Sequence, residues 1–314
     1  MIVVTGGSGF IGSALLAALR HAGIAAKGTS RHPDTRRGEL VAVGAIDGQT
    51  DWHRVLEGVR VVVHLAARVH VLPAGSSDGL DQYRLTNVAG TARLAEQAAA
   101  SGAERFVFVS SIKVNGETTD GAPFSETDAA SPVDPYAVSK YEAEQTLKAI
   151  AARTGLETVM VRPPLVYGPG VKANFLRLMR AVDRGIPLPL ARVDNRRSLI
   201  GITNLVDFLI QCATRPEAAG ETFLVSDGED ISTPALIRRL AHALGRAPRL
   251  WPVPVGMLAA GARMLGQRGA FESLCGSLQI DISRAREVLG WHPVKSLEEE
   301  LGETVRWYRD LTRT

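Results

Sequence analysis

The chain of 314 residues contains very little cysteine, with only Cys212 and Cys275. Two cysteines cannot build the disulfide framework of a small secreted protein, and this usage fits a reducing compartment such as the cytosol. We expect both to be small buried hydrophobic side chains rather than reactive thiols. The seven histidines include no pair four residues apart, and none lies beside a cysteine or a carboxylate cluster. A metal site is therefore not expected.

A large excess of one charge is also missing. Lys and Arg number 36 against 33 for Asp and Glu, which leaves a net charge of +3 over the whole chain. Although the sequence pI is about 9.0, this excess is too small to indicate a nucleic-acid-binding protein.

Long apolar runs are absent as well. No uncharged run approaches the ~20 residues that a membrane-spanning helix needs. The longest, residues 250–262, carries proline and glycine in its first half and stops at Arg263. We expect it to lead into a packed or interfacial helix. Met1 runs directly into apolar residues 2–5, so the sequence predicts no targeting segment and a cytoplasmic protein.

Short β-branched runs alternate with longer helical stretches in the first half of the chain. This alternation indicates βαβ units and therefore an α/β fold, a Rossmann-type doubly wound parallel sheet. The strands are predicted over residues 2–5, 25–29, 41–46, 59–65, 105–110 and 157–162, and the helices over 10–21, 80–100 and 135–153.

The second half of the chain does not continue this alternation of strands and helices. Residues 164–202 are rich in Pro, Gly and Arg. We expect a dinucleotide-binding domain over residues 1–165, joined by about 200–225, and a smaller interleaved C-terminal substrate domain, mainly 166–314. Helices are predicted over 174–184, 203–213, 233–244 and 297–311, with a short strand over 223–225.

The turn between the first strand and the first helix is rich in glycine. Gly6, Gly9 and Gly12 form the pattern GxxGxxG, with Phe10 and Ile11 between the last two. Glycine permits a tight turn and the close approach of a pyrophosphate, which the N-terminus of the following helix can bind. In this strand–turn–helix context the motif predicts a dinucleotide cofactor, bound by all five residues.

The end of the second strand selects between NAD and NADP. An acidic residue there would bind the ribose 2′-hydroxyl and repel a 2′-phosphate, but this chain has Ser30 and Arg31, with Arg36 and Arg37 close behind. Serine and arginine can hold a phosphate through hydrogen bonds, charge-assisted in the case of arginine. The sequence therefore favours NADP over NAD. Asp47, after the third strand, is expected to contact the adenine edge.

Tyr136 and Lys140 lie four residues apart at the start of a predicted helix, so both side chains share one face. An ammonium beside a phenol stabilises the tyrosinate and lowers a pKa that starts near ~10. Ser110 and Ser111 end the fifth strand, at the edge where ligands bind in an open α/β sheet. We expect Ser111 to hydrogen-bond the same substrate oxygen as Tyr136, and Lys140 to hold the nicotinamide ribose as well.

Six motifs occur in order along the chain: TGGSGFIG at 5–12, HLAA at 64–67, NVAGT at 87–91, VSS at 109–111, YAVSK at 136–140 and RPPLVYGPG at 162–170. Over nearly its whole length the chain thus resembles the extended short-chain dehydrogenases/reductases of the nucleotide-sugar epimerase and dehydratase group. The resemblance implies that Ser111, Tyr136 and Lys140 form the catalytic triad. It also implies a homodimer formed through the helices at 88–100 and 136–152.

The resemblance implies further binding residues on both sides of the site. Lys113 either reaches the substrate or stays in solvent. The cofactor groove would be lined by Leu65, Ala66, Ala67 and Ser110, with Asn87 supporting the hydrogen-bond network and Pro163 near the nicotinamide. A UDP-sugar would be held by Asn174, Phe175 and Arg197.

Departures from the family pattern narrow the reaction. The 4,6-dehydratases of this family carry an Asp-Glu pair after the catalytic Ser or Thr, whereas Ile112 and Lys113 stand here. The acid and base that elimination of water needs are therefore missing, and hydride transfer at C4 of a UDP-hexose remains.

Two reactions of this kind are consistent with the sequence, reduction and epimerisation at C4. The Ser30–Arg31 pattern favours NADPH-dependent reduction of a UDP-2-acetamido-2,6-dideoxy-4-hexulose, for synthesis of a surface polysaccharide such as lipopolysaccharide. The alternative is a UDP-glucose or UDP-N-acetylglucosamine 4-epimerase with tightly bound NAD. A non-catalytic dinucleotide sensor is a more remote alternative, because Ser111, Tyr136 and Lys140 are all intact.

Overall fold

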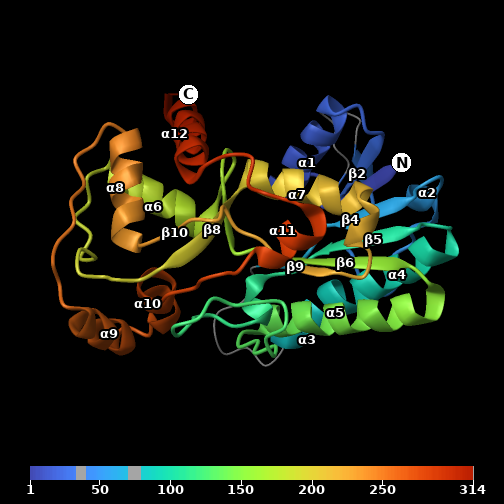
Figure 1. Ribbon diagram of the computed structural model, residues 1–314, viewed down its shortest axis with the longest axis horizontal. Coiled ribbons are helices and arrows are strands. Elements are labelled where there is room, and N and C mark those ends of the chain that lie inside the picture. Colours follow the sequence, from blue (N-terminus) through green and yellow to red (C-terminus); the bar gives the residue numbers. More distant parts are fainter. Residues whose placement is uncertain (33–39, 70–78, 314) are drawn as a thin grey trace.

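The computed structural model describes residues 1–32, 40–69 and 79–313. Its main layer is a seven-stranded parallel sheet in the order β3-β2-β1-β4-β5-β6-β9 (Figure 1). The doubly wound sheet predicted from the sequence is confirmed, and the short strand predicted near residue 224 joins its edge. The strands are β1 (Ile2–Thr5), β2 (Ala26–Ser30), β3 (Leu40–Ala42), β4 (Val61–His64), β5 (Arg105–Val109), β6 (Glu157–Arg162) and β9 (Thr222–Leu224).

Helices cover both faces of this sheet (Figure 1). One face carries α1 (Phe10–His21), α7 (Ile202–Thr214) and α11 (Ser283–Leu289), and the other carries α2 (His53–Leu56), α4 (Gly90–Ala100) and α5 (Pro135–Thr154). Successive residues of a strand point to opposite faces. Val4 accordingly belongs to the core under α1 and α7, and Val3 to the core under α4 and α5. Burial on both faces explains why the central strands are apolar throughout.

The helix predicted over 80–100 contains a π-helical turn. It begins as α3 (Gly79–Tyr83), widens into η1 (Arg84–Ala89) and continues as α4. A π turn inserts one extra residue without changing the apolar pattern enough to be recognised in the sequence. The turn contains the buried Asn87.

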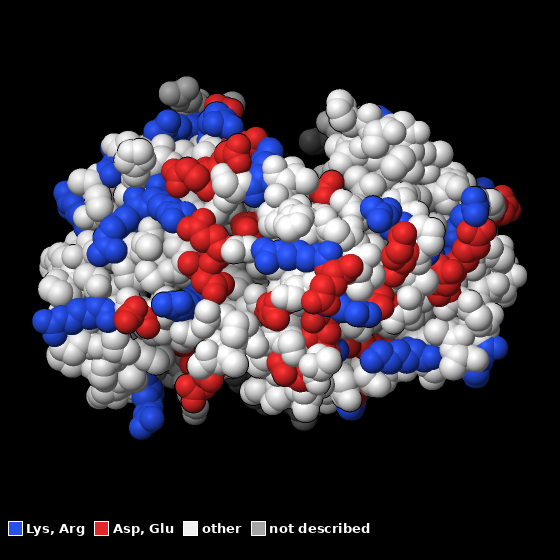
Figure 2. Space-filling model, in the orientation of Figure 1, with Lys and Arg blue, Asp and Glu red and all other residues white. Residues whose placement is uncertain are grey.

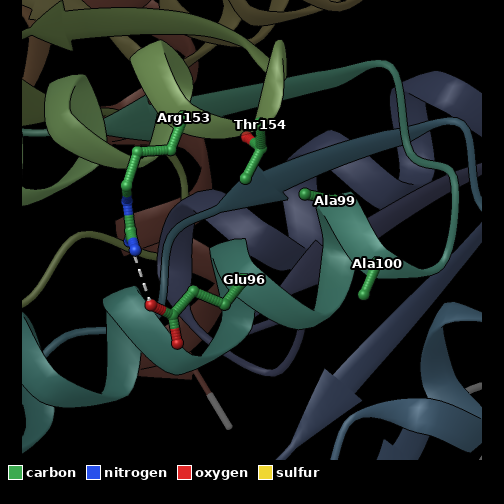
Figure 3. Close-up of a pocket in the computed structure, with 5 residues that line it drawn as sticks. All are labelled: Glu96, Ala99, Ala100, Arg153 and Thr154. Atoms are coloured by element: carbon green, nitrogen blue, oxygen red, sulfur yellow. Dashed lines mark hydrogen bonds and ion pairs between the residues drawn. The ribbon is translucent and has the colours of Figure 1, made fainter.

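Helices α4 and α5 pack side by side, and Figure 3 shows a small pocket between their C-terminal ends. Glu96 of α4 and Arg153 of α5 form an exposed ion pair there, with 3.3 Å between oxygen and nitrogen. Ala99, Ala100 and Thr154 complete its lining. Tyr136 lies at the other end of α5, about 25 Å away along the helix. This pocket therefore lies far from the predicted catalytic residues.

A second, three-stranded sheet forms beside the first, in the order β10-β8-β7. Its strands, β7 (Leu165–Tyr167), β8 (Arg197–Gly201) and β10 (Asp230–Ile231), were not expected from the sequence. The helices α6 (Ala173–Asp183), α8 (Thr233–Ala243) and α12 (Leu297–Arg313) pack with it around a separate core. β7 and β10, with three and two residues, are too short to show an alternating pattern, and β8 lies in the stretch rich in Pro, Gly and Arg.

The remaining helical segments are short. They are η2 (Ile112–Val114), η3 (Pro216–Ala218), α9 (Val255–Met264) and α10 (Arg268–Cys275). Cys212 lies in the core as expected, whereas Cys275 is only partly buried, because α10 lies at the edge of the second core. Within the described ranges every helix is too short or too polar to cross a bilayer.

Candidate active site

A cleft of about 810 Å³ opens at the carboxyl ends of β1, β4, β5 and β6. The strand order reverses between β1 and β4, where the connecting chains leave to opposite sides and open a crevice for ligands. Most of the predicted site residues line this cleft: Gly6, Gly9, Phe10, Ile11, Gly12, Arg31, Leu65, Ala66, Ala67, Ser110, Ser111, Tyr136, Lys140, Pro163, Asn174 and Phe175.

The glycine-rich turn forms one wall of the cleft. Gly6 adopts a left-handed conformation with φ of 67°, and its carbonyl accepts the Gly9 N–H at 2.9 Å. A Cβ atom on Gly12 would lie 2.2 Å from the Gly6 oxygen, so only glycine lets α1 start this close to β1. No side chain caps the N-terminus of α1. Its backbone N–H groups are therefore available to an anion such as a pyrophosphate.

The N-terminus of α5 positions Tyr136 and Lys140, two of the three catalytic candidates. The side chain of Asp134 accepts the Ala137 N–H at 2.7 Å, and Pro135 occupies the first turn. Both features fix the start of a helix. Tyr136 and Lys140 therefore lie one helical turn apart, and both reach the cleft.

Burial shifts the pKa of both side chains toward their neutral forms. Lys140 is only 2% exposed, and burial lowers its pKa to about 7, partly opposed by Glu144. Its Nζ atom lies 4.1 Å from the centre of the Phe108 ring, a cation–π contact. Burial also raises the pKa of Tyr136 well above its usual range, with the Asp134 carboxylate adding to the effect. Ionising Tyr136 therefore requires a neighbouring positive charge, which a protonated Lys140 can supply.

His64 is a buried residue to which the sequence analysis assigned no role. Its Nδ1 atom lies 2.7 Å from the hydroxyl of Thr5, and its Nε2 atom lies 3.0 Å from the hydroxyl of Thr91. The Thr5 oxygen also accepts the N–H groups of Leu65 and Ala66, each at 3.2 Å. Burial lowers the pKa of His64 to about 3, so the ring stays neutral. This chain of hydrogen bonds fixes the backbone that forms the cleft wall after β4.

Asn87 lies one layer behind the cleft. Its side chain accepts the Arg68 N–H at 2.8 Å and donates to the Ser139 hydroxyl at 2.9 Å. It therefore ties the loop after β4 to α5, next to Lys140. This placement matches a supporting role in the hydrogen-bond network, and Asn87 does not itself line the cleft.

Among the described residues predicted to select the cofactor at the end of β2, only Arg31 lines the cleft. The Ser30 hydroxyl donates to the His32 carbonyl at 2.6 Å, so its proton is already used within the turn. Arg36 and Arg37 lie outside the described residues.

Asp47 serves a local turn rather than the cleft. Its carboxylate accepts the Gln49 N–H at 2.8 Å and the Thr50 hydroxyl at 3.3 Å. Its neighbour Ile46 lines the cleft, but Asp47 does not.

Lys113 is bound within the protein. Its Nζ atom lies 2.5 Å from the carboxylate of Asp134 and 3.0 Å from that of Glu117. Although burial opposes the effect, these carboxylates raise the pKa of Lys113. The side chain thus links the turn after Ser111 to the N-terminus of α5, and it does not line the cleft.

The substrate side of the cleft includes two of the three predicted residues. Asn174 and Phe175 lie at the start of α6, and the Phe175 ring stacks on Tyr167 with 5.3 Å between ring centres. Arg197 on β8 instead donates to the Gly276 carbonyl at 2.9 Å, outside the cleft lining. Lys172, which the sequence analysis missed, lines the cleft just before α6.

The cleft fits a dinucleotide on features of its own. The glycine turn exposes backbone without side chains to the cleft, and the first helix presents uncapped N–H groups. The buried Ser110 hydroxyl has no hydrogen-bond partner among the described residues, although it lies in the cleft wall. The hydrogen-bonding capacity of this hydroxyl is therefore open to a ligand or a water molecule in the cleft.

Comparisons with known proteins agree with this assignment. Residues 2–226 match the model of the NAD dependent epimerase/dehydratase family. The chain is 44% identical over 309 residues to a UDP-glucose 4-epimerase of Vibrio cholerae, covering 97% of this chain and 94% of that protein. It is 31% identical to a 2-alkyl-3-oxoalkanoate reductase of Stenotrophomonas maltophilia, with 96% and 97% covered.

A solved structure extends the likeness to the fold. The structure of MoeE5 in complex with UDP-glucose and NAD matches with a TM-score of 0.80 at 28% identity, over 99% of both chains. The resemblance inferred from the sequence motifs is thus confirmed. The chain belongs to the NAD dependent epimerase/dehydratase family, as an enzyme of the nucleotide-sugar epimerase group of extended short-chain dehydrogenases/reductases.

Proposed function

We propose that the protein is a UDP-hexose 4-epimerase that retains NAD throughout its catalytic cycle. The observation that carries this proposal is the 44% identity to a UDP-glucose 4-epimerase along nearly the whole chain. Ser111, Tyr136 and Lys140 also line one cleft, as the chemistry requires. The sequence had favoured NADPH-dependent reduction of a UDP-2-acetamido-2,6-dideoxy-4-hexulose, and the comparisons give that reaction no specific support.

Each of the three residues has its own role in proton transfer at the sugar. Tyr136 removes the proton from the C4 hydroxyl while Ser111 hydrogen-bonds the same oxygen. Lys140, when protonated, stabilises the tyrosinate needed for this step. Bound NAD would take up the hydride from C4 and return it after the sugar has turned. Tyr136 then gives the proton back to the oxygen, so no reductant is consumed.

The residues after β2 support NAD rather than NADP. A 2′-phosphate would need several donors, but the Ser30 hydroxyl is committed to His32. Arg31 alone lines the cleft there. Because Arg31 could still contact a 2′-phosphate, an NADP-dependent ketoreductase is the second candidate function. We propose that the glycine turn holds the pyrophosphate and that Leu65 and Pro163 border the nicotinamide side.

We propose that residues 166–314 mainly hold the UDP-sugar. Asn174 and Phe175 are at the cleft, and Arg197 would have to leave the Gly276 carbonyl in order to reach a diphosphate. We further propose a homodimer formed through α4 and α5. Light scattering on the purified protein is expected to give about twice the chain mass of 33.6 kDa, and a mass equal to one chain would contradict the dimer.

The cofactor assignment can be tested by denaturing the purified protein and identifying any released dinucleotide by mass spectrometry. We expect NAD at close to one molecule per chain. NADP, or a site purified empty, would instead support the exchanging cofactor of a ketoreductase.

A matched pair of glycine variants tests where the dinucleotide is bound. Gly12→Ala places a Cβ atom against the Gly6 oxygen and should purify without the dinucleotide. Gly256→Ala, where a Cβ atom meets open space, should retain it. Equal NAD content in both variants would show that the cofactor is not held by the glycine turn.

A further inference from the structure

A charge asymmetry marks the segment from residue 231 to residue 271, which the proposed reaction does not use. The segment contains none of the chain's 33 acidic residues. Arg239 and Arg246 pair with Glu229 and Asp183, which belong to other parts of the chain. The arginines of the segment are Arg238, Arg239, Arg246, Arg249, Arg263 and Arg268.

The same segment exposes large apolar side chains. Met264 is 89% exposed and Trp251 is 60% exposed. Among the described residues, every large apolar side chain that is at least 60% exposed lies here except Val133. None of the ten residues of α9 is buried. Soluble proteins rarely expose apolar side chains in a group unless the group contacts something else.

Three exposed residues of α9 share one face. Met257, Ala260 and Met264 follow the spacing i, i+3, i+7, which places them along a single stripe. Leu258 points to the opposite side and packs against the second core. Arg263, which is exposed, borders the stripe. The helix is thus attached through one face and presents the other outward.

One exposed arginine and one exposed tryptophan lie in the extended segment before α9. Arg249 and Trp251 are both exposed and two residues apart, so they point to the same side of the extended chain. The backbone between them pairs with Leu188, which holds this segment against the rest of the protein. In Figure 2 the lower left of the molecule, over α9, is mostly white, with blue side chains and a few red ones beside it.

We propose that the surface formed by Trp251, Met257, Arg263, Met264 and Leu265, called here the α9 surface, docks onto an anionic phospholipid bilayer. A helix of ten residues is about 15 Å long, too short to span a bilayer but able to lie in its interface. Arginine favours anionic headgroups, and the absence of acidic residues in the segment removes repulsion. Tryptophan is favoured at the boundary between headgroups and acyl chains.

The position of the α9 surface suits such docking. In Figure 1, α9 lies at the end of the molecule away from the seven-stranded sheet and from α4 and α5. None of the residues of the α9 surface lines the catalytic cleft. The protein can therefore contact a bilayer while the cleft and the proposed dimer face remain uncovered.

Vesicle sedimentation with the full-length protein tests the proposal. We expect binding to vesicles that contain phosphatidylglycerol, weaker binding to pure phosphatidylcholine, and release at high salt because charge attraction is screened. The double variant Met264→Asp/Leu265→Asp should lower the partition coefficient at least about tenfold, since it removes two apolar side chains and adds repulsion. Val294→Asp changes an apolar residue that is 54% exposed elsewhere and should bind as the wild type does.

Three results would overturn the proposal. The first is wild-type protein that stays in the supernatant with anionic vesicles, and the second is a double variant that sediments like the wild type. The third is self-association, seen by light scattering, that the double variant abolishes, which would make the surface a contact between copies of the chain. Epimerase activity of the double variant verifies its folding. Should it misfold, a vesicle-induced blue shift of wild-type fluorescence that Trp251→Phe removes supplies the same test.

Discussion

At the scale of single residues, the proposed chemistry depends on two side chains whose charged forms are both disfavoured by burial. Burial lowers the pKa of Lys140 to about 7 and raises that of Tyr136. The Glu144 carboxylate favours the Lys140 ammonium, which lies 4.1 Å from the centre of the Phe108 ring. A charged Lys140 can in turn favour the Tyr136 phenolate. This coupling explains why the pair must occupy one helical face.

Replacing Tyr136 by Phe is expected to lower kcat by about 10²–10⁴-fold, because the proton acceptor for the C4 hydroxyl is lost while the ring remains. Steady-state assay with a UDP-hexose measures the effect. The melting temperature of the variant should stay close to that of the wild type. Activity within a factor of a few of the wild type would remove Tyr136 from the mechanism.

Replacing Lys140 by Met should abolish activity and stabilise the cofactor-free protein. The folded pKa of about 7 lies below the ordinary value of 10.5, so the unfolded chain binds more protons between these pH values. Burial of the Lys140 charge therefore lowers the free energy of unfolding by its full amount below about pH 7. This destabilisation disappears as the pH rises toward 10.5.

The gain in melting temperature of Lys140→Met should accordingly be largest near pH 6 and small near pH 10. Thermal unfolding of the two cofactor-free proteins across this range is the measurement. A gain that grows with pH would contradict the sign of the pKa shift.

Single residues also show how far sequence reasoning reaches. Gly6, Gly12, Tyr136 and Lys140 line the cleft as the sequence predicts, because backbone geometry and helical spacing constrain their positions directly. The hydroxyl of Ser30 was assigned to a phosphate, yet it bonds a neighbouring carbonyl. Such local hydrogen bonds leave no trace in residue type or spacing.

At the scale of elements, a buried ion pair connects α5 to β6. The Arg162 guanidinium donates to both carboxylate oxygens of Glu144, at 2.9 and 2.5 Å, and to the Asn115 side chain at 2.9 Å. Glu144 lies one turn after Lys140, and Arg162 immediately precedes Pro163 at the cleft. The network therefore holds α5, which carries Tyr136 and Lys140, against the strand end that borders the cleft.

Replacing Glu144 by Gln should lower the free energy of unfolding by about 3–5 kcal/mol, because the buried Arg162 charge loses its counter-charge. Urea unfolding measures the change. Glu96→Gln in the exposed pair with Arg153 is the control and should cost less than about 1 kcal/mol (Figure 3). Equal costs in the two variants would contradict the structural role given to the buried pair.

The elements that sequence reasoning missed are the ones fixed by distant contacts. The strands β7 and β8 pair with each other although some 30 residues separate them, and β10 consists of only Asp230 and Ile231. The π turn η1 is held by Asn87, which bonds α5 and the loop after β4. Local pattern carries no information about partners so far along the chain.

At the scale of the whole molecule, the parallel sheet and its cleft followed from the alternation of strands and helices and from the glycine turn. The sequence favoured NADP and reduction, whereas the comparisons favour NAD and epimerisation. Reduction and epimerisation share the same catalytic residues and differ in whether the cofactor is exchanged. Residue motifs alone therefore cannot separate them.

The most direct test of the account is turnover of UDP-glucose by the purified protein with no cofactor added, followed by proton NMR. We predict that UDP-galactose appears until a constant ratio is reached, that the same ratio is reached from UDP-galactose, and that no NADH accumulates. Failure to interconvert the two sugars, together with NADPH-dependent reduction of a 4-keto sugar, would contradict the assignment as a 4-epimerase.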